Sequence, residues 1–218
     1  MNKQITIDGP AASGKTSIGK KVSSQLKWRF LDTGLMYRAA TWLVIKNKID
    51  VSDESNILLS ILNSDFSISS EYKEDSLIID TQNVITELRT PEIDKYVSQI
   101  SRITKVREIL VEQQREIAKS GDIVMVGRDI GSVVLPNANT KIYLDASLDV
   151  RSKRRFEETE ENEDMTFEEV KKDLQNRDII DSKRQTSPLI IPENATVINT
   201  DSLTMLQVVA EIISVVEI

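Results

Sequence analysis

Five short runs of apolar residues punctuate the chain, and amphipathic segments long enough for helices separate them. The runs are rich in Ile and Val and alternate little with polar residues, so we expect strands buried on both faces. A parallel sheet with helices on both faces meets this requirement. The pattern therefore predicts an α/β fold with strands at residues 4–7, 28–31, 123–126, 141–144 and 196–198.

The segments between the strands have helical periodicity. Asp53, Ser147 and Asp201 each stand before such a segment, and their short polar side chains are suited to capping a helix N-terminus. We predict helices at residues 14–26, 35–46, 54–62, 91–100, 105–119, 147–158, 166–178 and 202–216.

Two stretches depart from this alternation. Residues 63–88 hold brief β-like pieces at 66–68, 76–79 and 84–85, which predict a small antiparallel insert near the ligand-binding edge of the sheet. Residues 151–181 form a densely charged helical stretch. We expect one domain over residues 1–218, with its core at 1–62, 89–150 and 182–218.

Composition narrows the chemistry. The 218 residues include no cysteine and no histidine, which excludes disulfides, thiolate chemistry and histidine general bases. A net charge of −7 argues against binding to a nucleic acid polymer or an anionic membrane, because both need a positive surface. With no export signal and no apolar run of about 18 residues, we expect a cytoplasmic protein.

The first predicted strand leads into a phosphate-binding loop, Gly-Pro-Ala-Ala-Ser-Gly-Lys-Thr at residues 9–16. Gly9 and Gly14 allow the backbone to turn its amides toward a polyphosphate. Lys15 is placed for the β- and γ-phosphates of a nucleotide, and the Thr16 hydroxyl for a Mg²⁺ ion. The residues expected to contact the polyphosphate are Gly9, Pro10, Ala11, Ala12, Ser13, Gly14, Lys15, Thr16 and Ser17.

Such loops occur in GTPase switches and in kinases. Residues 47–50, Asn-Lys-Ile-Asp, match a guanine-reading motif, but they follow the loop too closely and the chain has no Asp-x-x-Gly. The segment 31–38 opens a predicted helix at the same sheet edge, where Arg38 offers a planar fork for a second phosphate. Alternatively, this segment is a turn with Asp32 as a cap and Tyr37 in the core.

Five successive stretches of the chain resemble signatures of the bacterial cytidylate kinases, in the same order and over nearly the whole chain: residues 9–16, 31–38, 87–92, 127–134 and 177–189. The resemblance implies transfer of the γ-phosphoryl group of ATP, with Mg²⁺, to CMP or dCMP. It also implies a nucleoside monophosphate subdomain at 63–88 and a mobile lid at 151–181. The CMP contacts implied by it are Thr33, Tyr37, Arg38, Ser98, Arg107, Arg128, Asp129, Arg177, Asp181 and Arg184.

Cytosine presents an amine donor and a ring-nitrogen acceptor. A carboxylate such as Asp181 can accept from the amine while Arg177 donates to the ring, and uracil would reverse this pattern. Asp129 is suited to sugar hydroxyls and Arg128 to the α-phosphate. The residues expected to act in catalysis are Lys15, Arg128, Asp129, Arg154, Arg155 and Arg184.

Arg154 and Arg155 lie in the charged stretch. They either belong to a salt-bridged exposed helix, with Arg154 pairing Glu158, or close over the transferring phosphoryl group as part of a lid. The residues do not decide which arginine would do so. The nearest rival functions are phosphorylation of another small acceptor, such as AMP, dTMP or shikimate, and nucleotide-dependent regulation without transfer. We expect a monomer.

Overall fold

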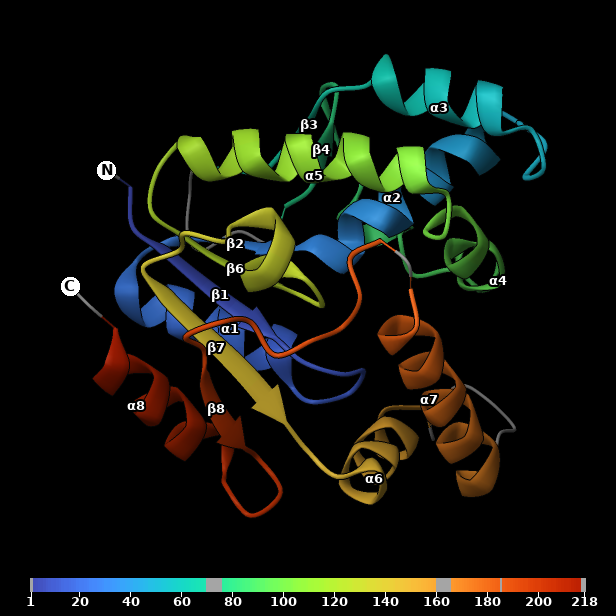
Figure 1. The fold of residues 1–218 in the computed structure, drawn as a ribbon. Helices are drawn as coiled ribbons and strands as arrows, with labels where there is room; N and C mark the ends of the chain where they lie inside the picture. The colour runs from blue at the N-terminus through green and yellow to red at the C-terminus, as the bar shows by residue number, and fades with distance from the viewer. Residues whose placement is uncertain (1, 70–75, 160–165, 185, 217–218) are drawn as a thin grey trace.

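The computed structural model describes residues 2–69, 76–159, 166–184 and 186–216. Its central sheet is parallel throughout, with the strand order β2-β6-β1-β7-β8 (Figure 1). The strands are β1 (Gln4–Asp8), β2 (Arg29–Asp32), β6 (Ile123–Gly127), β7 (Thr140–Asp145) and β8 (Thr196–Asn199). The prediction of an α/β fold on a five-stranded parallel sheet is confirmed, with the strands displaced by a residue or two at most.

Helices cover both faces of the sheet, as the apolar runs require. On one face, α1 (Lys15–Leu26) and α8 (Met205–Val215) pack over Val124 and Val126 of β6. The alternate residues Ile123 and Met125 face the other side, where α2 (Thr33–Lys46) and α5 (Thr104–Lys119) lie. Each strand residue of β6 is therefore buried, and this explains why the sequence run shows no polar alternation.

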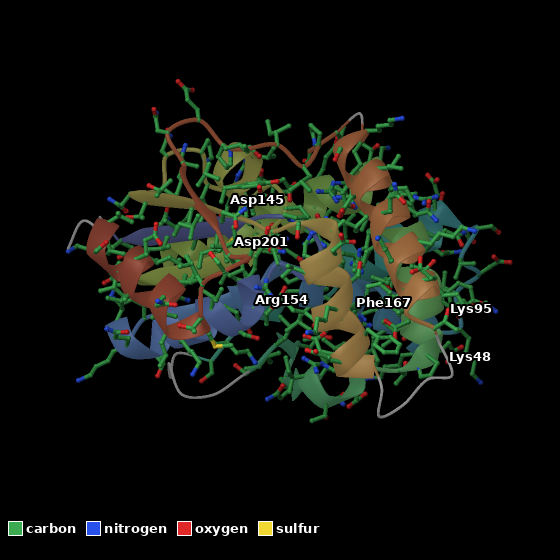
Figure 2. All side chains as sticks on the ribbon, turned by 90° about the horizontal axis from the view of Figure 1, so that it is seen from below. Lys48, Lys95, Asp145, Arg154, Phe167 and Asp201 are labelled. Carbon is green, nitrogen blue, oxygen red and sulfur yellow. The ribbon has the colours of Figure 1, made fainter. Side chains whose placement is uncertain are left out.

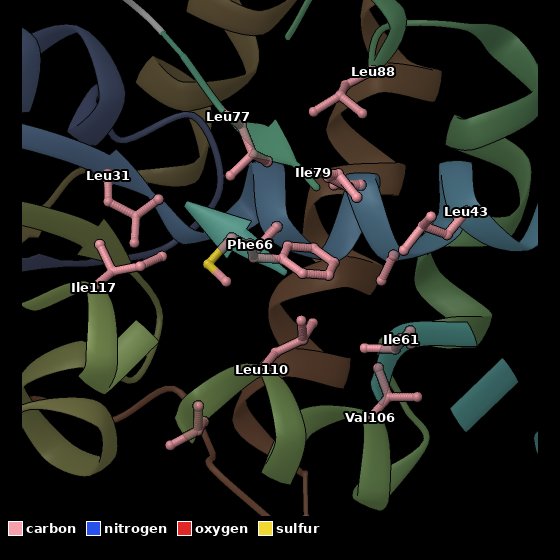
Figure 3. Close-up of a cluster of buried hydrophobic side chains, with 14 of the residues drawn as sticks. Leu31, Leu43, Ile61, Phe66, Leu77, Ile79, Leu88, Val106, Leu110 and Ile117 are labelled. Atoms are coloured by element: carbon pink, nitrogen blue, oxygen red, sulfur yellow. The ribbon is translucent and has the colours of Figure 1, made fainter. Parts of the chain in front are cut away.

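The larger apolar cluster extends beyond the sheet to α3 (Glu54–Leu62) and a small antiparallel sheet (Figure 3). That sheet consists of β3 (Phe66–Ser67), β4 (Ile78–Ile79) and β5 (Gln82–Asn83). Phe66 lies among Leu110, Ile79 and Leu43 in Figure 3 and is almost fully buried. The small sheet thus shares the core of the protein. The boundaries 63–88 for the insert stay a prediction.

The expectation of a strand at residues 84–85 is wrong. Ile85–Glu87 form a turn of 3₁₀ helix, and β5 precedes it. Val84 ends the hairpin: its amide donates to the carbonyl of Leu77 at 2.9 Å, its own carbonyl accepts from the amide of Glu87, and its side chain is fully buried. The apolar side chain at this position anchors the turn and does not continue a strand.

The remaining helices are α4 (Pro91–Ile100), α6 (Leu148–Thr159), α7 (Phe167–Ser182) and a short π-helix, η2 (Ile130–Val134). The caps expected at Asp53 and Ser147 are confirmed, since they accept from the amides of Asn56 and Val150. Asp201 does not cap α8. It accepts from the amide of Ser147, and Thr204 caps α8 in a capping box with Gln207.

Within the described ranges, no helix has both the length and the apolar character needed to cross a membrane.

Candidate active site

The phosphate loop connects β1 to α1 at the carboxyl edge of the sheet. Gly14 caps α1 in the left-handed region, with φ of 89°. A Cβ on Gly9 would lie 2.3 Å from the carbonyl oxygen of Leu144 at the end of β7. Only glycine lets the loop pass this close to the neighbouring strand, so Gly9 sets where the loop leaves the sheet.

Lys15 is folded over the loop itself. Its Nζ donates to the carbonyl of Pro10 at 2.5 Å and to the Ser13 hydroxyl at 3.2 Å, and only 7% of the residue is exposed. Burial lowers the pKa of Lys15 well below its ordinary value, and the positive charge of Arg128 lowers this pKa further. An anion bound in the loop would stabilise the ammonium, so the site is suited to a negatively charged ligand.

Thr16 and Asp32 provide the oxygen atoms that a metal ion would need. The Thr16 hydroxyl donates to Asp32 Oδ2 at 2.6 Å, while Asp32 Oδ1 accepts from the amide of Gly34 and caps α2. Hydroxyl and carboxylate oxygens suit Mg²⁺, which keeps most of its ligands as water and substrate phosphate. Within the described residues no cluster of three acidic side chains could hold a metal alone. The donor set therefore fits a Mg²⁺ that arrives with a nucleotide.

Two buried carboxylates organise the arginines next to this loop. Asp181 of α7 is 2% exposed and accepts from Arg128 Nε at 2.9 Å and from Arg184. Asp129 pairs with Arg107 of α5 at 2.7 Å, and both side chains are nearly fully buried. The end of β6, α5 and α7 are thereby joined through charged groups. Removing one partner of such a pair would leave an uncompensated buried charge.

Tyr37 lies beside the second pair, with the Arg107 guanidinium 5.2 Å from the centre of its ring. Burial raises the pKa of Tyr37 to about 12. A buried phenol beside an arginine and a carboxylate is suited to contact a planar polar ligand.

Positive charge converges around Arg177. Burial is the main cause that lowers the pKa of Arg177, and the positive charges of Arg128, Arg38 and Arg155 lower it further. The negative charge of Asp181 opposes them. Burial likewise lowers the pKa of Arg184. The charges of Arg128 and Arg177 also act on Lys15, and the charge of Arg128 acts on Arg184. The phosphate loop therefore adjoins a cluster of arginines, Arg128, Arg177 and Arg184, which we call the arginine cluster. A phosphate group would relieve this repulsion.

Arg38 and Thr33 are bound to groups outside these ion pairs. Arg38 donates to the carbonyl of Leu88 at 2.8 Å and pairs with Asp94 of α4, and the hydroxyl of Thr33 donates to the carbonyl of Val126. Ser17 and Ser98 are exposed. Within the described residues, neither serine side chain has a hydrogen bond to the arginine cluster.

The charged stretch forms two helices, α6 and α7, that pack against the phosphate loop. Arg151, which was not among the predicted site residues, is 6% exposed, donates to the carbonyl of Ala11 at 3.2 Å and pairs with Asp178 at 2.7 Å. Val170 and Leu174 of α7 contact Ala11 in a small apolar cluster. In sequence, Arg151 differs in no visible way from the basic residues that follow it. The lid limits 151–181 stay a prediction.

Arg154 and Arg155 point to different surroundings. Arg154 donates to the hydroxyl and the carbonyl of Thr200 at 3.0 and 2.7 Å, on the side of α6 that faces the core (Figure 2). The alternative pairing of Arg154 with Glu158 is not formed, since Arg155 pairs with Glu158 at 3.4 Å. The charge of Arg155 acts on Arg177. Arg155 therefore lies toward the arginine cluster.

A second residue missed from the sequence is Asp8, a buried carboxylate at the last position of β1. A charged residue ending an apolar strand, directly before the phosphate loop, was the available signal.

A phosphate loop ending β1, beside a cluster of arginines at the same edge of a parallel sheet, defines the P-loop kinases that act on small molecules. Solved structures agree on this fold. A shikimate kinase from Bacteroides thetaiotaomicron superposes with a TM-score of 0.52 over 100% of both chains at 13% identity. A protein from Eubacterium ventriosum gives 0.55 over 98% of this chain and 97% of its own at 12% identity.

The chain belongs to the cytidylate kinase family, whose model matches residues 5–218. It is 43% identical to the cytidylate kinase of Caldanaerobacter subterraneus over 97% of this chain and 93% of that one. The cytidylate kinase of Alkaliphilus oremlandii is 41% identical, over 98% and 97%. A bifunctional pantoate ligase/cytidylate kinase of Prochlorococcus marinus is 43% identical, over 96% of this chain and 42% of that protein. The protein is thus an enzyme, a phosphotransferase.

Proposed function

We propose that this enzyme transfers the γ-phosphoryl group of ATP to CMP or dCMP and releases ADP and CDP or dCDP. The observation that carries the proposal is the adjacency of Lys15 and Arg128, whose charges act on each other across the end of the sheet. Lys15 belongs to the phosphate loop, and Arg128 is held by Asp181. This adjacency supports the proposal of two phosphate sites that face each other, as transfer between two nucleotides requires.

The donor nucleotide would bind in the loop of residues 9–16, with Lys15 on its β- and γ-phosphates. Thr16, with Asp32 behind it, would hold Mg²⁺ through oxygen atoms. When bound, this ion would neutralise charge on the donor phosphates. The proposal for the metal rests on this donor set and on membership of a kinase family.

The acceptor needs no general base, because a phosphate oxygen of CMP is already anionic. That oxygen would attack the γ-phosphorus, and the bond from this phosphorus to the bridging oxygen of ADP would break. The transition state is loose, so alignment and positive charge supply most of the catalysis. Arg128, Arg184 and Arg177 would hold the acceptor phosphate in line.

Two carboxylates are candidates for reading the cytosine amine. Asp181, with Arg177 beside it, is the reader expected from the sequence, with Asp129 on the sugar. The structure favours Asp129 as a second candidate, since Asp181 already accepts from two arginines close to the donor loop. Among the residues that the structure describes, Asp129 pairs with Arg107 alone, next to the Tyr37 ring. In both cases an aligned carboxylate and arginine would distinguish cytosine from uracil.

Arg155 is the lid arginine that we place on the transferring phosphoryl group, because its charge reaches Arg177 while Arg154 is attached to Thr200. The lid would exclude water that could otherwise hydrolyse ATP. We infer a cytoplasmic location from the metabolites used, and a monomer, to be checked by sedimentation equilibrium.

The test is ADP production with ATP and Mg²⁺ across CMP, dCMP, UMP, AMP and dTMP as acceptors. We expect CMP and dCMP to be phosphorylated with the highest kcat/KM. A higher kcat/KM for AMP or dTMP would refute the proposal. ADP formation at the same rate with and without acceptor would instead indicate a nucleotide hydrolase.

A further inference from the structure

Asp8 occupies an unusual place between the donor and acceptor sides. It ends β1 immediately before Gly9 and is fully buried. Its neighbours Ile5 and Ile7 face α1 and α8, so strand alternation turns Thr6 and Asp8 to the opposite face of the sheet. There Asp8 meets η2, which follows Arg128 and Asp129 directly in the chain.

Both carboxylate oxygens of Asp8 are used. Oδ1 accepts from the amide of Ile130 at 2.7 Å, and Oδ2 accepts from the amide of Gly131 at 2.8 Å. Successive backbone amides are thus bound by one side chain, an arrangement with strong charge-assisted hydrogen bonds. With both oxygens engaged, Asp8 is a poor candidate for a general base or a metal ligand.

The turn also packs tightly on β1. A Cβ on Gly131 would lie 2.8 Å from the Thr6 hydroxyl, 3.0 Å from Pro192 and 3.1 Å from Asp8 Oδ2. Asp8 is paired in register with Gly127, where β6 ends. The short segment 128–129 is therefore fixed at both ends against the last residue of β1.

We propose that Asp8 is a positioning residue for CMP: its carboxylate fixes the turn at residues 130–131, and thereby the places of Arg128 and Asp129. The inference rests on the proposed function of these two residues. An apolar side chain at this position would leave the buried amides of Ile130 and Gly131 without an acceptor, and the turn would lose its attachment to β1. The carboxylate therefore aligns the two acceptor-binding side chains with the phosphate loop.

The test compares nucleotide affinities of Asp8→Asn with those of the wild type by titration calorimetry, using CMP and a nonhydrolysable ATP analogue separately. Asparagine keeps the shape of the aspartate side chain but has a single acceptor oxygen. Its NH₂ group would face the backbone N–H of either Ile130 or Gly131, which would lose its acceptor. We expect CMP affinity to fall by about tenfold or more and ATP-analogue affinity to change by less than about threefold, because displaced ligand contacts cost this much.

Asp122→Asn is the matched control. Asp122 Oδ1 accepts from the amide of Lys3 at 2.7 Å and so ties the same two strands at the opposite end of the sheet. This control should leave both affinities unchanged. Unchanged CMP affinity in Asp8→Asn, or equal loss of both ligands, would overturn the proposal.

Gly131→Ala is a second variant that tests the proposal if Asp8→Asn does not fold. This variant retains the Asp8 carboxylate, but the added methyl group would move the turn at residues 130–131 away from β1. We expect the same selective loss of CMP affinity. Wild-type CMP affinity in Gly131→Ala would count against the proposal. If the acceptor panel identifies a different substrate, the proposed function fails, and the same comparison with that substrate still tests Asp8.

Discussion

The guanidinium of Arg151 donates to the carbonyl oxygen of Ala11, which joins α6 to the phosphate loop. Asp178 of α7 binds the same guanidinium, so a single side chain connects α6, α7 and the loop. Both helices are thereby attached to the loop that is expected to bind ATP.

This connection leads to a prediction for donor binding. Arg151→Met should raise KM for ATP by about tenfold with a smaller effect on KM for CMP, because a charge-assisted contact to the loop is lost. Steady-state kinetics with each substrate varied would measure both constants. Lys153→Met is the control, since Lys153 is on the same helix but 76% exposed. Equal effects of the two substitutions would contradict the role of Arg151.

Lys15→Ala should lower kcat by at least about a hundredfold, because a buried ammonium next to the transferred group stabilises developing charge. Lys21→Ala, at an exposed position of the same helix, serves as the comparison and should keep the wild-type rate. Turnover can be followed by coupled ADP detection at saturating substrates. A Lys15→Ala variant with near-normal kcat would remove the loop lysine from the mechanism.

Substitution of Arg154 should affect the stability of the protein, and substitution of Arg155 should affect catalysis. Arg154→Ala removes two hydrogen bonds to Thr200 and should lower the free energy of unfolding by about 1–2 kcal/mol. Arg155→Ala should lower kcat by about a hundredfold while the free energy of unfolding changes little, because the Arg155 side chain is 49% exposed and its ion pair with Glu158 lies at the surface. Urea unfolding and steady-state turnover of both variants would decide. The reverse pattern would place Arg154 on the transferring group.

The two candidate cytosine readers are distinguishable by acceptor preference. If Asp129 reads the amine, Asp129→Asn should reduce the CMP to UMP ratio of kcat/KM by about tenfold, since discrimination of this kind is worth about 1–3 kcal/mol. Asp181→Asn should then lower kcat/KM for both acceptors alike. The opposite result, a changed ratio in Asp181→Asn alone, would support the pairing of Asp181 with Arg177.

Asp8 makes stability depend on pH. Burial is the main cause that raises its pKa from 3.8 to about 6, with Asp129 adding to the shift and the two backbone amides and Lys15 opposing it. The folded protein therefore keeps this proton between pH 3.8 and 6, where the unfolded chain has lost it. The stabilisation of the folded protein by this proton is complete below pH 3.8, the pKa of Asp8 in the unfolded chain, and is lost as pH rises through about 6.

The free energy of unfolding should fall by about 3 kcal/mol across this pH range, because each unit of pKa difference between the folded and unfolded states corresponds to about 1.4 kcal/mol. Urea unfolding of the wild type and Asp8→Asn at several pH values from about 4 to 7 would isolate it, because asparagine does not titrate. The wild-type advantage should decrease across that window. A difference independent of pH would show that Asp8 is ionised throughout.

Strands and helices could be predicted because their apolar spacing is determined locally. Ile5, Ile7, Val124 and Val126 are apolar on a strand covered on both faces, and this pattern is visible in the chain itself. Val84 was misread because an apolar residue that anchors a turn has the same appearance as one in a strand. Asp201 was predicted as a cap because the start of a helix cannot be located exactly from the sequence; α8 begins at Met205, and Thr204 is its cap.

The candidate site could be predicted only in part. The loop lysine and hydroxyl follow from spacing, and the arginines from family signatures, but their partners are brought together by the fold. Arg128 and Asp181 are 53 residues apart in sequence, and Arg107 and Asp129 are 22 residues apart. The role of Arg151 depends on a backbone carbonyl of Ala11, which no side-chain pattern encodes.

The apolar contact of Ala11 with Val170 and Leu174 makes the attachment of α7 to the phosphate loop depend on temperature. Separating α7 from the loop would expose hydrocarbon to water, so forming this contact carries a negative change in heat capacity. Hydrophobic contacts of this kind weaken on cooling. At low temperature the ion pair and hydrogen bond of Arg151 therefore carry a larger share of the attachment between α7, α6 and the loop.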